Sequence, residues 1–156
     1  MEKKILVAFD NSENSVKAIE MIGEIFTRDH KITILSIIPD TAAVCSLCGS
    51  ELSPHFTSQQ SVYCAMEEKH RDTMEEAQKK AKQMLVQKGF PEENIKLKIE
   101  ITKKGVARDI VHESMSGYST IVMGRRGYSG IKEFFMGSVS HKVISVSKDV
   151  SILVVE

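Results

Sequence analysis

Several features that would direct a chain to a membrane or to a charged polymer are missing from these 156 residues. The apolar runs are far shorter than the roughly 20 residues of a membrane-spanning helix, so we expect no membrane span. Lysine and arginine together number 21, and so do aspartate and glutamate, which leaves a formal net charge of zero. We therefore expect no general attraction to nucleic acid or to anionic membranes.

Cysteine is scarce, and the N-terminal segment lacks the pattern of a secretory signal. Lysines precede the apolar run at residues 5–9, but the run is short and ends at Asp10 without a small-residue cleavage site. Three cysteines, an odd number, are typical of a reducing compartment. The composition predicts a cytoplasmic α/β protein, and a chain of this length can bury roughly two-thirds of its unfolded surface in a single domain.

Two common phosphate-binding signatures are also absent, because the sequence contains neither G-x-x-x-x-G-K-[ST] nor G-x-G-x-x-G. A different pattern, G-x2-G-x9-G-S, is formed by Gly124, Gly127, Gly137 and Ser138 after the apolar run at 121–123. Glycine lets the backbone turn and approach a ligand closely. A helix is expected to begin at the Gly-Ser pair, and its unpaired N–H groups would suit phosphate. We interpret the stretch as a phosphate-binding loop.

Apolar runs alternate with amphipathic segments along the chain. The runs predict five strands, at residues 5–9, 32–38, 95–101, 120–123 and 151–155. Apolar residues three or four positions apart predict helices within 16–26, 66–85, 105–116 and 139–146. In the third strand, strict alternation with charged residues indicates a solvated face and therefore a sheet edge. The order of elements predicts a mainly parallel, doubly wound sheet with its ligand beyond the carboxyl ends of the strands.

One segment breaks this regularity. Residues from about 40 to 62 show no clear periodicity, and we predict an irregular insertion there, followed by the long helix. A structureless stretch of this length is uncommon in a compact domain and is often functional or mobile. The whole chain, 1–156, is predicted to form one domain that contains this insertion.

The glycine pattern, its place after the fourth strand and Asp10 at the end of the first strand resemble the nucleotide-binding branch of the universal stress protein family. The resemblance covers nearly the whole chain outside the insertion. It implies a five-stranded sheet of order 3-2-1-4-5, in which the first and fourth strands are neighbours. It also implies an adenine nucleotide, ATP with Mg²⁺ or Mn²⁺, and a homodimer. The apolar last strand, 151–155, could pair with its copy to form that dimer.

The resemblance implies a set of nucleotide-binding residues at three strand ends and at the start of the last helix: Ala8, Asp10, Ile37, Met123, Gly124, Arg126, Gly127, Gly137, Ser138, Val139 and Ser140. Arg126 could hold a phosphate with two hydrogen bonds. Simpler explanations remain open at this stage. Asp10 could serve only as a helix cap, and Arg125, Arg126 and Lys132 could form a solvated basic loop.

A catalytic group is harder to identify. ATP hydrolysis needs metal-bound phosphates and a residue that positions water, and Asp10 is the one plausible carboxylate near the loop. His141 fits a surface or packing role better than a catalytic one. We expect a stress-response switch that binds ATP and hydrolyses it slowly at most. An ATP-cleaving α-hydrolase is an alternative, but such enzymes carry an S-G-G-x-D-S loop, and residues 10–15 contain no glycine.

The cysteines allow other chemistry. Cys45 and Cys48 have metal-like or redox-like spacing, and Cys64 with His55 or His70 could complete a tetrahedral zinc site. A second cysteine pair is missing, and a redox CxxC normally opens a helix. Zinc binding, a redox switch and inert cysteines all remain open. A non-nucleotide interaction module with such a loop is a further alternative function.

Overall fold

The computed structural model describes residues 3–40, 54–127 and 136–156, and within the long helix the side chains of 54–64, 66 and 67 are left out. In chain order the elements are β1 (Lys4–Ala8), α1 (Glu13–Ile25), β2 (Lys31–Ile38), α3 (Pro54–Gln87), a 3-10 turn η1 (Glu92–Asn94), β3 (Ile95–Ile101), α4 (Val106–Ser114), β4 (Thr120–Gly124), α5 (Ser138–Val146) and β5 (Ser151–Val155).

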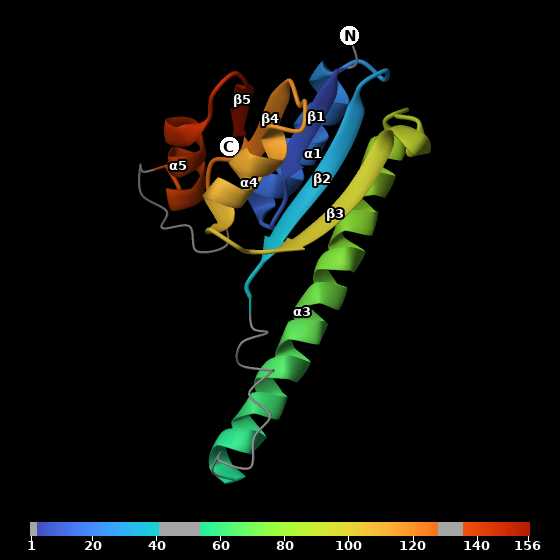
Figure 1. The fold of residues 1–156 in the computed structure, drawn as a ribbon. Coiled ribbons are helices and arrows are strands. Elements are labelled where there is room, and N and C mark those ends of the chain that lie inside the picture. The colour runs from blue at the N-terminus through green and yellow to red at the C-terminus, as the bar shows by residue number, and fades with distance from the viewer. Residues whose placement is uncertain (1–2, 41–53, 128–135) are drawn as a thin grey trace.

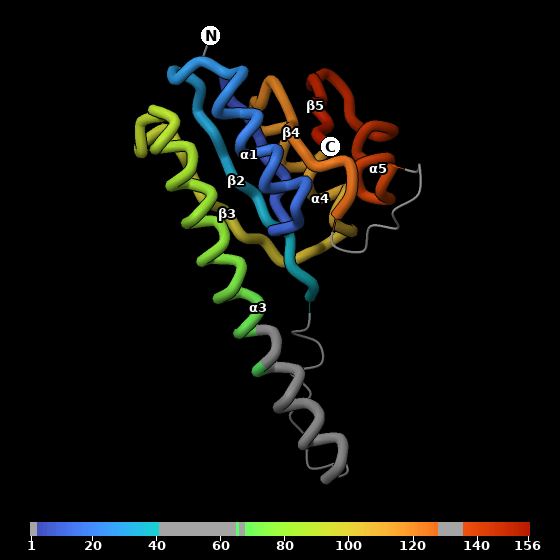
Figure 2. Tube along the Cα trace, turned by 180° about the vertical axis from the view of Figure 1, so that it is seen from behind, coloured from blue at the N-terminus to red at the C-terminus, as the bar shows by residue number. Residues whose placement is uncertain are grey.

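The strands form one parallel sheet in the order β3-β2-β1-β4-β5. Helices α1 and α3 cover one face of the sheet, and α4 and α5 cover the other (Figures 1 and 2). The order confirms the prediction that the first and fourth strands are neighbours and that the third lies at an edge. The free edge of β5 is on the opposite side of the sheet.

The central strands carry the core on both faces. Ile5 and Val7 of β1 point into a cluster with α1 and α3, whereas Leu6 points into a second cluster with α4 and α5. All three side chains are completely buried. Full burial of an aliphatic side chain of this size contributes about 1.5–3 kcal/mol, which explains why the first strand is a continuous apolar run.

Helix α3 begins earlier than the sequence predicted. It starts at Pro54, so residues 54–62, expected to be irregular, are helical. Proline fits the first helical position, where its missing N–H has no partner to lose. The helix contacts the sheet through its last turns, where Met74, Ala81 and Leu85 are buried, and it continues beyond the edge of the sheet (Figure 1). The sequence of residues 54–62 has no clear helical period of apolar residues, which is why the pattern did not predict this part of the helix.

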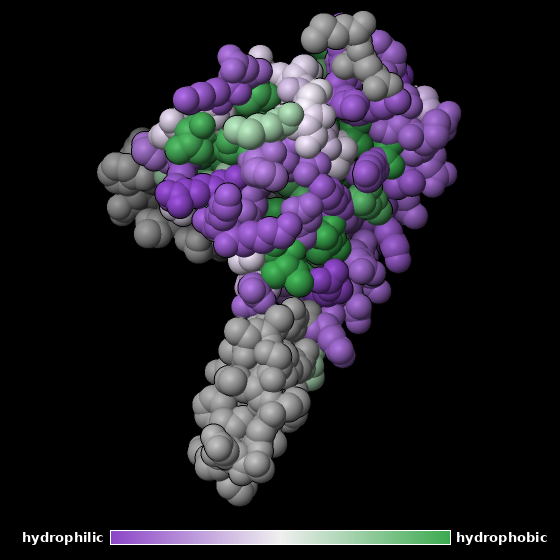
Figure 3. Space-filling view, in the orientation of Figure 1, coloured by the Kyte–Doolittle hydropathy of each residue, from purple (hydrophilic) through white to green (hydrophobic). Residues whose placement is uncertain are grey.

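The surface is predominantly polar on the face that carries α4 and α5, where hydrophilic side chains surround small, separate hydrophobic patches (Figure 3). Within the described parts of the chain, no helix is long and apolar enough to cross a membrane, in agreement with the sequence-based expectation.

Candidate functional site

A cavity of about 740 Å³ lies at the carboxyl edge of the sheet. It is bounded by the ends of β1, β2 and β4 and by the first turns of α4 and α5. The eleven residues assigned to the nucleotide site from the sequence all line it: Ala8, Asp10, Ile37, Met123, Gly124, Arg126, Gly127, Gly137, Ser138, Val139 and Ser140. Residues as far apart in the chain as Ala8 and Ser140 thus meet in one cavity, because parallel strands end at the same edge.

Three glycines allow backbone segments to approach each other around this cavity. A Cβ at Gly124 would lie 2.7 Å from Cβ of Asn14, so the absence of a side chain lets the start of α1 pack on the end of β4. A Cβ at Gly127 would lie 2.6 Å from Oδ2 of Asp10. At Gly137 it would lie 3.1 Å from the carbonyl oxygen of Arg125. Contacts below 3.0 Å are not tolerated without movement, so the spacing of the motif reflects close packing.

Asp10 organises the turn between β1 and α1. Its Oδ1 accepts hydrogen bonds from the backbone N–H of Ser12, at 3.0 Å, and from the Ser12 hydroxyl. The same Ser12 is the N-cap of α1 and accepts from the N–H of Ser15 at 3.3 Å. The cap predicted as the simpler role of Asp10 is therefore present indirectly, through Ser12. Its second oxygen, Oδ2, lies beside Gly127.

Helix α4 carries a carboxylate in its first turn. Asp109 is buried and accepts hydrogen bonds from the N–H groups of Lys103 and Lys104, at 2.8 and 3.1 Å, and from the Thr102 hydroxyl at 2.9 Å. Burial by itself raises the pKa of this carboxyl, but the three donors outweigh burial and lower it below its ordinary value. A fixed negative charge therefore occupies the start of α4.

The start of α5 is open by comparison. Its N-cap, Gly137, supplies no side-chain hydrogen bond, and the first intrahelical bond runs from the N–H of His141 to the Gly137 carbonyl at 2.9 Å. By helix geometry, the N–H groups of Ser138, Val139 and Ser140 have no intrahelical acceptor. These groups and the positive end of the helix dipole lie at the wall of the cavity. Of α1, α4 and α5, which begin at this edge in the described parts of the chain, α5 is thus the best suited to an anion.

The hydroxyl of Ser140 braces the loop. It is buried and lies 2.7 Å from the carbonyl oxygen of Arg125 and 3.0 Å from that of Gly137. The N–H of Gly137 also donates to the Arg125 carbonyl, at 3.0 Å. Because its single proton is directed at backbone oxygens, Ser140 shapes the site, and the exposed hydroxyl of Ser138 is the better donor to a ligand.

Two arginines follow β4 and share one partner. Nη1 of Arg125 lies 2.6 Å, and Nη2 of Arg126 3.0 Å, from the same oxygen, Oε1 of Glu156. Of the two, Arg126 lines the cavity. Asp10 and Arg126 are the charged side chains among the described lining residues, one of each sign.

The opposite part of the cavity is apolar and was largely missed by sequence reasoning. Leu35 and Pro39 belong to the end of β2 and the segment after it, Val106 and Ile110 belong to α4, and Met136 precedes the Gly-Ser pair. Phe9, Ser12 and Ser15 also line the cavity. One signal could have identified Pro39 and Val106, because they lie close after parallel strands and such positions meet at the ligand edge of the sheet.

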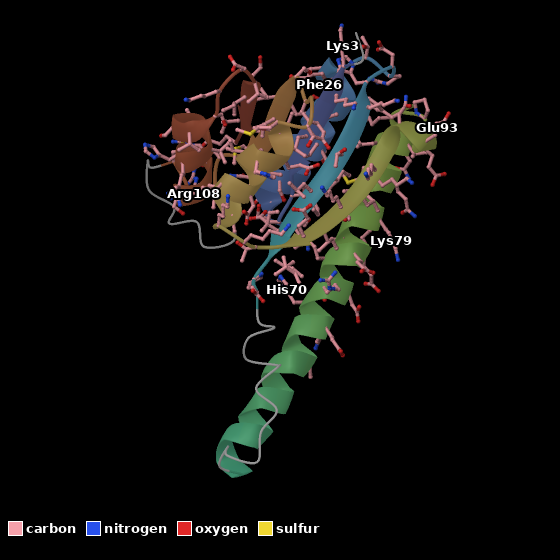
Figure 4. The ribbon with its side chains drawn as sticks, viewed as in Figure 1. Lys3, Phe26, His70, Lys79, Glu93 and Arg108 are labelled. Carbon is pink, nitrogen blue, oxygen red and sulfur yellow. The ribbon has the colours of Figure 1, made fainter. Side chains whose placement is uncertain are left out.

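The two described histidines among the sequence candidates do not line this cavity. His141 is exposed and does not line it, as the sequence favoured. His70 lies on the exposed part of α3 (Figure 4). Cys45, Cys48 and Lys132 lie outside the described residues, and so do the side chains of Cys64 and His55. Among the side chains that are described, no three His, Cys, Asp or Glu residues are grouped as metal ligands would be.

A smaller cavity of about 270 Å³ lies between α1 and α3. Its wall is mainly apolar and includes Val16, Ile19 and Ala81, with Lys80 and Glu76 also present. It contains none of the motif glycines and no start of a helix that would hold an anion, so we assign the candidate site to the larger cavity.

Fold and cavity together define a doubly wound α/β protein with a glycine-lined cavity at the switch point of its sheet. The sequence model of the universal stress protein family matches residues 1–156. The chain belongs to the universal stress protein family. The Bacillus subtilis (strain 168) protein YxiE, a universal stress protein, is 32% identical over 151 residues, which cover 94% of this chain and 95% of YxiE.

Solved structures show the same fold. Universal stress protein UspA from Lactobacillus plantarum superimposes with a TM-score of 0.69 at 20% identity, covering 99% of this chain and 97% of its own. A universal stress protein in complex with cAMP superimposes with a TM-score of 0.62 at 18% identity, and the match covers 99% of this chain and 97% of that protein. The universal stress protein from Archaeoglobus fulgidus in complex with dAMP superimposes with a TM-score of 0.57 at 16% identity, and the match covers 99% of this chain and 98% of that protein. Two relatives of this fold thus bind adenine nucleotides.

Proposed function

We propose that this protein binds ATP in the cavity at the carboxyl edge of the sheet and acts as a nucleotide-dependent regulatory protein of the stress response. One observation carries the proposal. Backbone glycines, the open start of α5 and Arg126 converge on the same cavity whose other wall is apolar. A nucleotide has matching parts, because its phosphates are anionic and its base is flat and largely apolar. The adenine nucleotides held by two relatives support the choice of base.

The sheet order suggests how the nucleotide lies. The phosphates belong at the start of α5, where Ser138 and Val139 offer N–H groups and Gly127 leaves room for close approach. The base belongs at the apolar wall made by Ile37 and Val106. Between them the ribose passes the end of β1, beside Asp10. Gly137 has no side chain to cap α5, and in this arrangement the phosphates of the ligand take the place of a capping side chain.

A divalent cation would accompany the phosphates. Asp10 is the carboxylate among the described lining residues, and a carboxylate suits Mg²⁺ or Mn²⁺. One of its oxygens already accepts from Ser12, which leaves Oδ2 to face the site. A second carboxylate that could position water is not among those lining residues. We therefore propose slow hydrolysis at most, so single-turnover rates like those of ordinary kinases would contradict this part.

The decisive experiment is mass spectrometry of the ligand released from purified protein, followed by calorimetric titration with ATP and magnesium. Recovered adenine nucleotide, or micromolar binding that is lost in Gly127→Val, would support the proposal. A control is Gly117→Val, which changes a glycine that does not line the cavity and that precedes the amino end of β4, at the opposite edge of the sheet. Gly117 has a φ of +88°, so this variant is expected to lose stability while keeping its affinity for ATP. Absence of nucleotide and of binding in the wild-type protein would overturn the proposal.

We further propose that the protein is cytoplasmic and forms a homodimer through β5. This strand lies at a sheet edge, and it includes the apolar residues Ile152, Leu153 and Val154. The N–H of Ser151 and the carbonyl of Val155 bond toward β4, so by alternation the N–H of Val154 faces the free edge. An exposed edge of this kind is a template for pairing with a second chain.

This geometry gives a specific test of the dimer. Val154→Pro removes an outward-facing N–H and leaves the ladder to β4 intact. We expect the variant to be monomeric by light scattering coupled to size-exclusion chromatography, with a helical circular-dichroism spectrum like that of the dimeric wild type. A monomeric wild-type protein at micromolar concentration would contradict the assignment.

A further inference from the structure

Glu156 connects the end of β5 to the charged wall of the cavity. Its Oε1 accepts from Nη2 of Arg126 at 3.0 Å and from Nη1 of Arg125 at 2.6 Å. The carboxylate is more than half exposed, whereas both guanidinium groups are largely covered. One carboxylate oxygen thus stands between two consecutive arginines, as a phosphate oxygen could.

The backbone fixes this arrangement. The N–H of Arg125 donates to the carbonyl oxygen of Val155 at 2.7 Å, which extends the β4–β5 pairing by one residue past the strand end. This places the backbone of residue 156 beside the loop that begins the glycine motif. The register of β4 and β5 therefore places Glu156 next to Arg125 and Arg126.

We propose that Glu156 is a specificity-determining residue that competes with the phosphates of a bound nucleotide for Arg126. The inference depends on the proposed function and adds a prediction about affinity. Without a nucleotide, the Glu156 carboxylate offsets part of the positive charge of Arg125 and Arg126. A nucleotide that uses Arg126 must displace this carboxylate or approach its negative charge. Glu156 thereby lowers the affinity of the site for phosphorylated ligands and leaves its affinity for the uncharged nucleoside unchanged.

The size of the effect follows from exposure. Solvent screens the exposed carboxylate, and measured exposed ion pairs correspond to changes of up to about five-fold in an equilibrium constant. We therefore expect Glu156→Gln to bind ATP about three- to five-fold more tightly than wild type. Adenosine, which has no phosphate to compete for Arg126, should bind the two proteins with the same affinity.

The test is calorimetric titration of ATP, AMP and adenosine into wild-type protein, Glu156→Gln, Arg126→Gln and the double variant. Arg126→Gln is expected to weaken ATP about ten-fold, and in the double variant the gain from Glu156→Gln should disappear. Glu156→Asp keeps the charge on a shorter side chain and should give an intermediate affinity for ATP. Thermal unfolding establishes that each variant is folded.

A matched control removes an equal charge elsewhere. Glu92 pairs with Lys82 at 3.0 Å and is exposed. It lies in η1, next to Glu93, at the amino-terminal end of β3 and so at the opposite edge of the sheet from the cavity (Figure 4). Glu92→Gln should leave the affinity for ATP unchanged, which separates competition at Arg126 from a general change in net charge.

The outcomes are distinct. A higher affinity for ATP than wild type, with unchanged adenosine binding and dependence on Arg126, supports the inference. If ATP binds wild type but Glu156→Gln leaves the ratio of ATP to adenosine affinity unchanged or lowers it, this inference is overturned and the proposed function stands. If wild-type protein binds neither ligand, both are overturned.

Discussion

Gly127 and Asp10 lie close together at the cavity wall, where a Cβ added at position 127 would be 2.6 Å from Oδ2 of Asp10. The two residues belong to different strand ends, after β4 and after β1. Their close approach joins the glycine loop to the turn that begins α1. Gly127 is exposed and is not among the residues with positive φ, so the structural reason for glycine here is this close approach at the cavity wall and not the backbone conformation.

We expect Gly127→Ala to weaken ATP binding at least ten-fold and to change stability by less than about 0.5 kcal/mol, as at other exposed positions. The added methyl group would push the Asp10 carboxylate and narrow the cavity. Calorimetry and urea unfolding would measure the two effects. Adding Asp10→Ala to this variant removes the atom in conflict. If the conflict is the cause, the effect of Gly127→Ala on binding should be smaller in an Asp10→Ala background than in wild type.

Two serines in the first turn of α5 offer a matched comparison. Ser140 is buried and braces the Arg125 and Gly137 carbonyls, whereas Ser138 is exposed. Ser140→Ala should lower the free energy of unfolding by about 1 kcal/mol, since it leaves buried acceptors with fewer donors. Ser138→Ala should leave stability unchanged and reduce affinity for ATP. Equal loss of stability in both variants would contradict the bracing role of Ser140.

The lowered pKa of Asp109 predicts a pH-dependent contribution to stability. Because the folded protein holds this carboxyl at a pKa below its unfolded value of about 3.9, the contribution is fully present at higher pH. It is lost as the pH falls through the folded pKa. We expect Asp109→Asn to cost about 1–2 kcal/mol at pH 7.

The difference between wild type and Asp109→Asn should therefore shrink below about pH 4, which urea unfolding at pH 7 and pH 3 can measure. Glu113→Gln is not a suitable control, because that carboxylate pairs with Lys98. Glu93→Gln is a better control, because Glu93 is exposed and does not belong to the hydrogen bonds around Asp109. Its effect on the free energy of unfolding should be the same at pH 7 and pH 3. A difference that stays constant between the two pH values would contradict the assignment.

The sheet and the part of the cavity formed by the strand ends and the glycine motif could be predicted from the sequence, because the apolar runs and the motif spacing agreed with the topology. Apolar runs placed all five strands within a residue of their observed ends, and family resemblance supplied their order. The glycine motif and Asp10 then had to meet, since parallel strands end at one edge. Pattern reasoning works well where a residue type has a single physical reason, such as Gly124 at the close approach of α1.

Other features depended on tertiary contacts that have no local signature. No local pattern in the sequence marks Ile110 as part of the cavity wall, because its place there comes from α4 packing over β2. Ser140 was expected to contact the nucleotide through its backbone or its hydroxyl, and nothing in the local sequence showed that the hydroxyl contacts the carbonyl oxygens of Arg125 and Gly137. Glu156 could not be paired with Arg126 from a pattern, because the pair spans 30 positions and depends on strand register.

Gln78 shows how such a contact can fix the helix that the sequence delimited least well. It is almost completely buried on α3, and its Nε2 lies 2.8 Å from the Ser36 hydroxyl, 3.0 Å from the Lys98 carbonyl and 3.2 Å from the Ile34 carbonyl. The Ser36 hydroxyl in turn donates to the Phe9 carbonyl at 2.6 Å. One amide therefore anchors α3 to β2 and β3.

Gln78→Met keeps a similar volume but removes the amide donor, so the Ile34 and Lys98 carbonyl groups and the Ser36 hydroxyl each lose one hydrogen bond. We expect the free energy of unfolding to fall by about 1–3 kcal/mol, measured by urea unfolding. Gln83→Met makes the same change on an exposed position of α3 and should stay within about 0.5 kcal/mol of wild type. Equal effects of the two substitutions would show that the amide contacts do not stabilise the fold. Since Ser36 lies between two residues of the cavity wall, Leu35 and Ile37, Gln78→Met should also weaken ATP binding, whereas Gln83→Met should not.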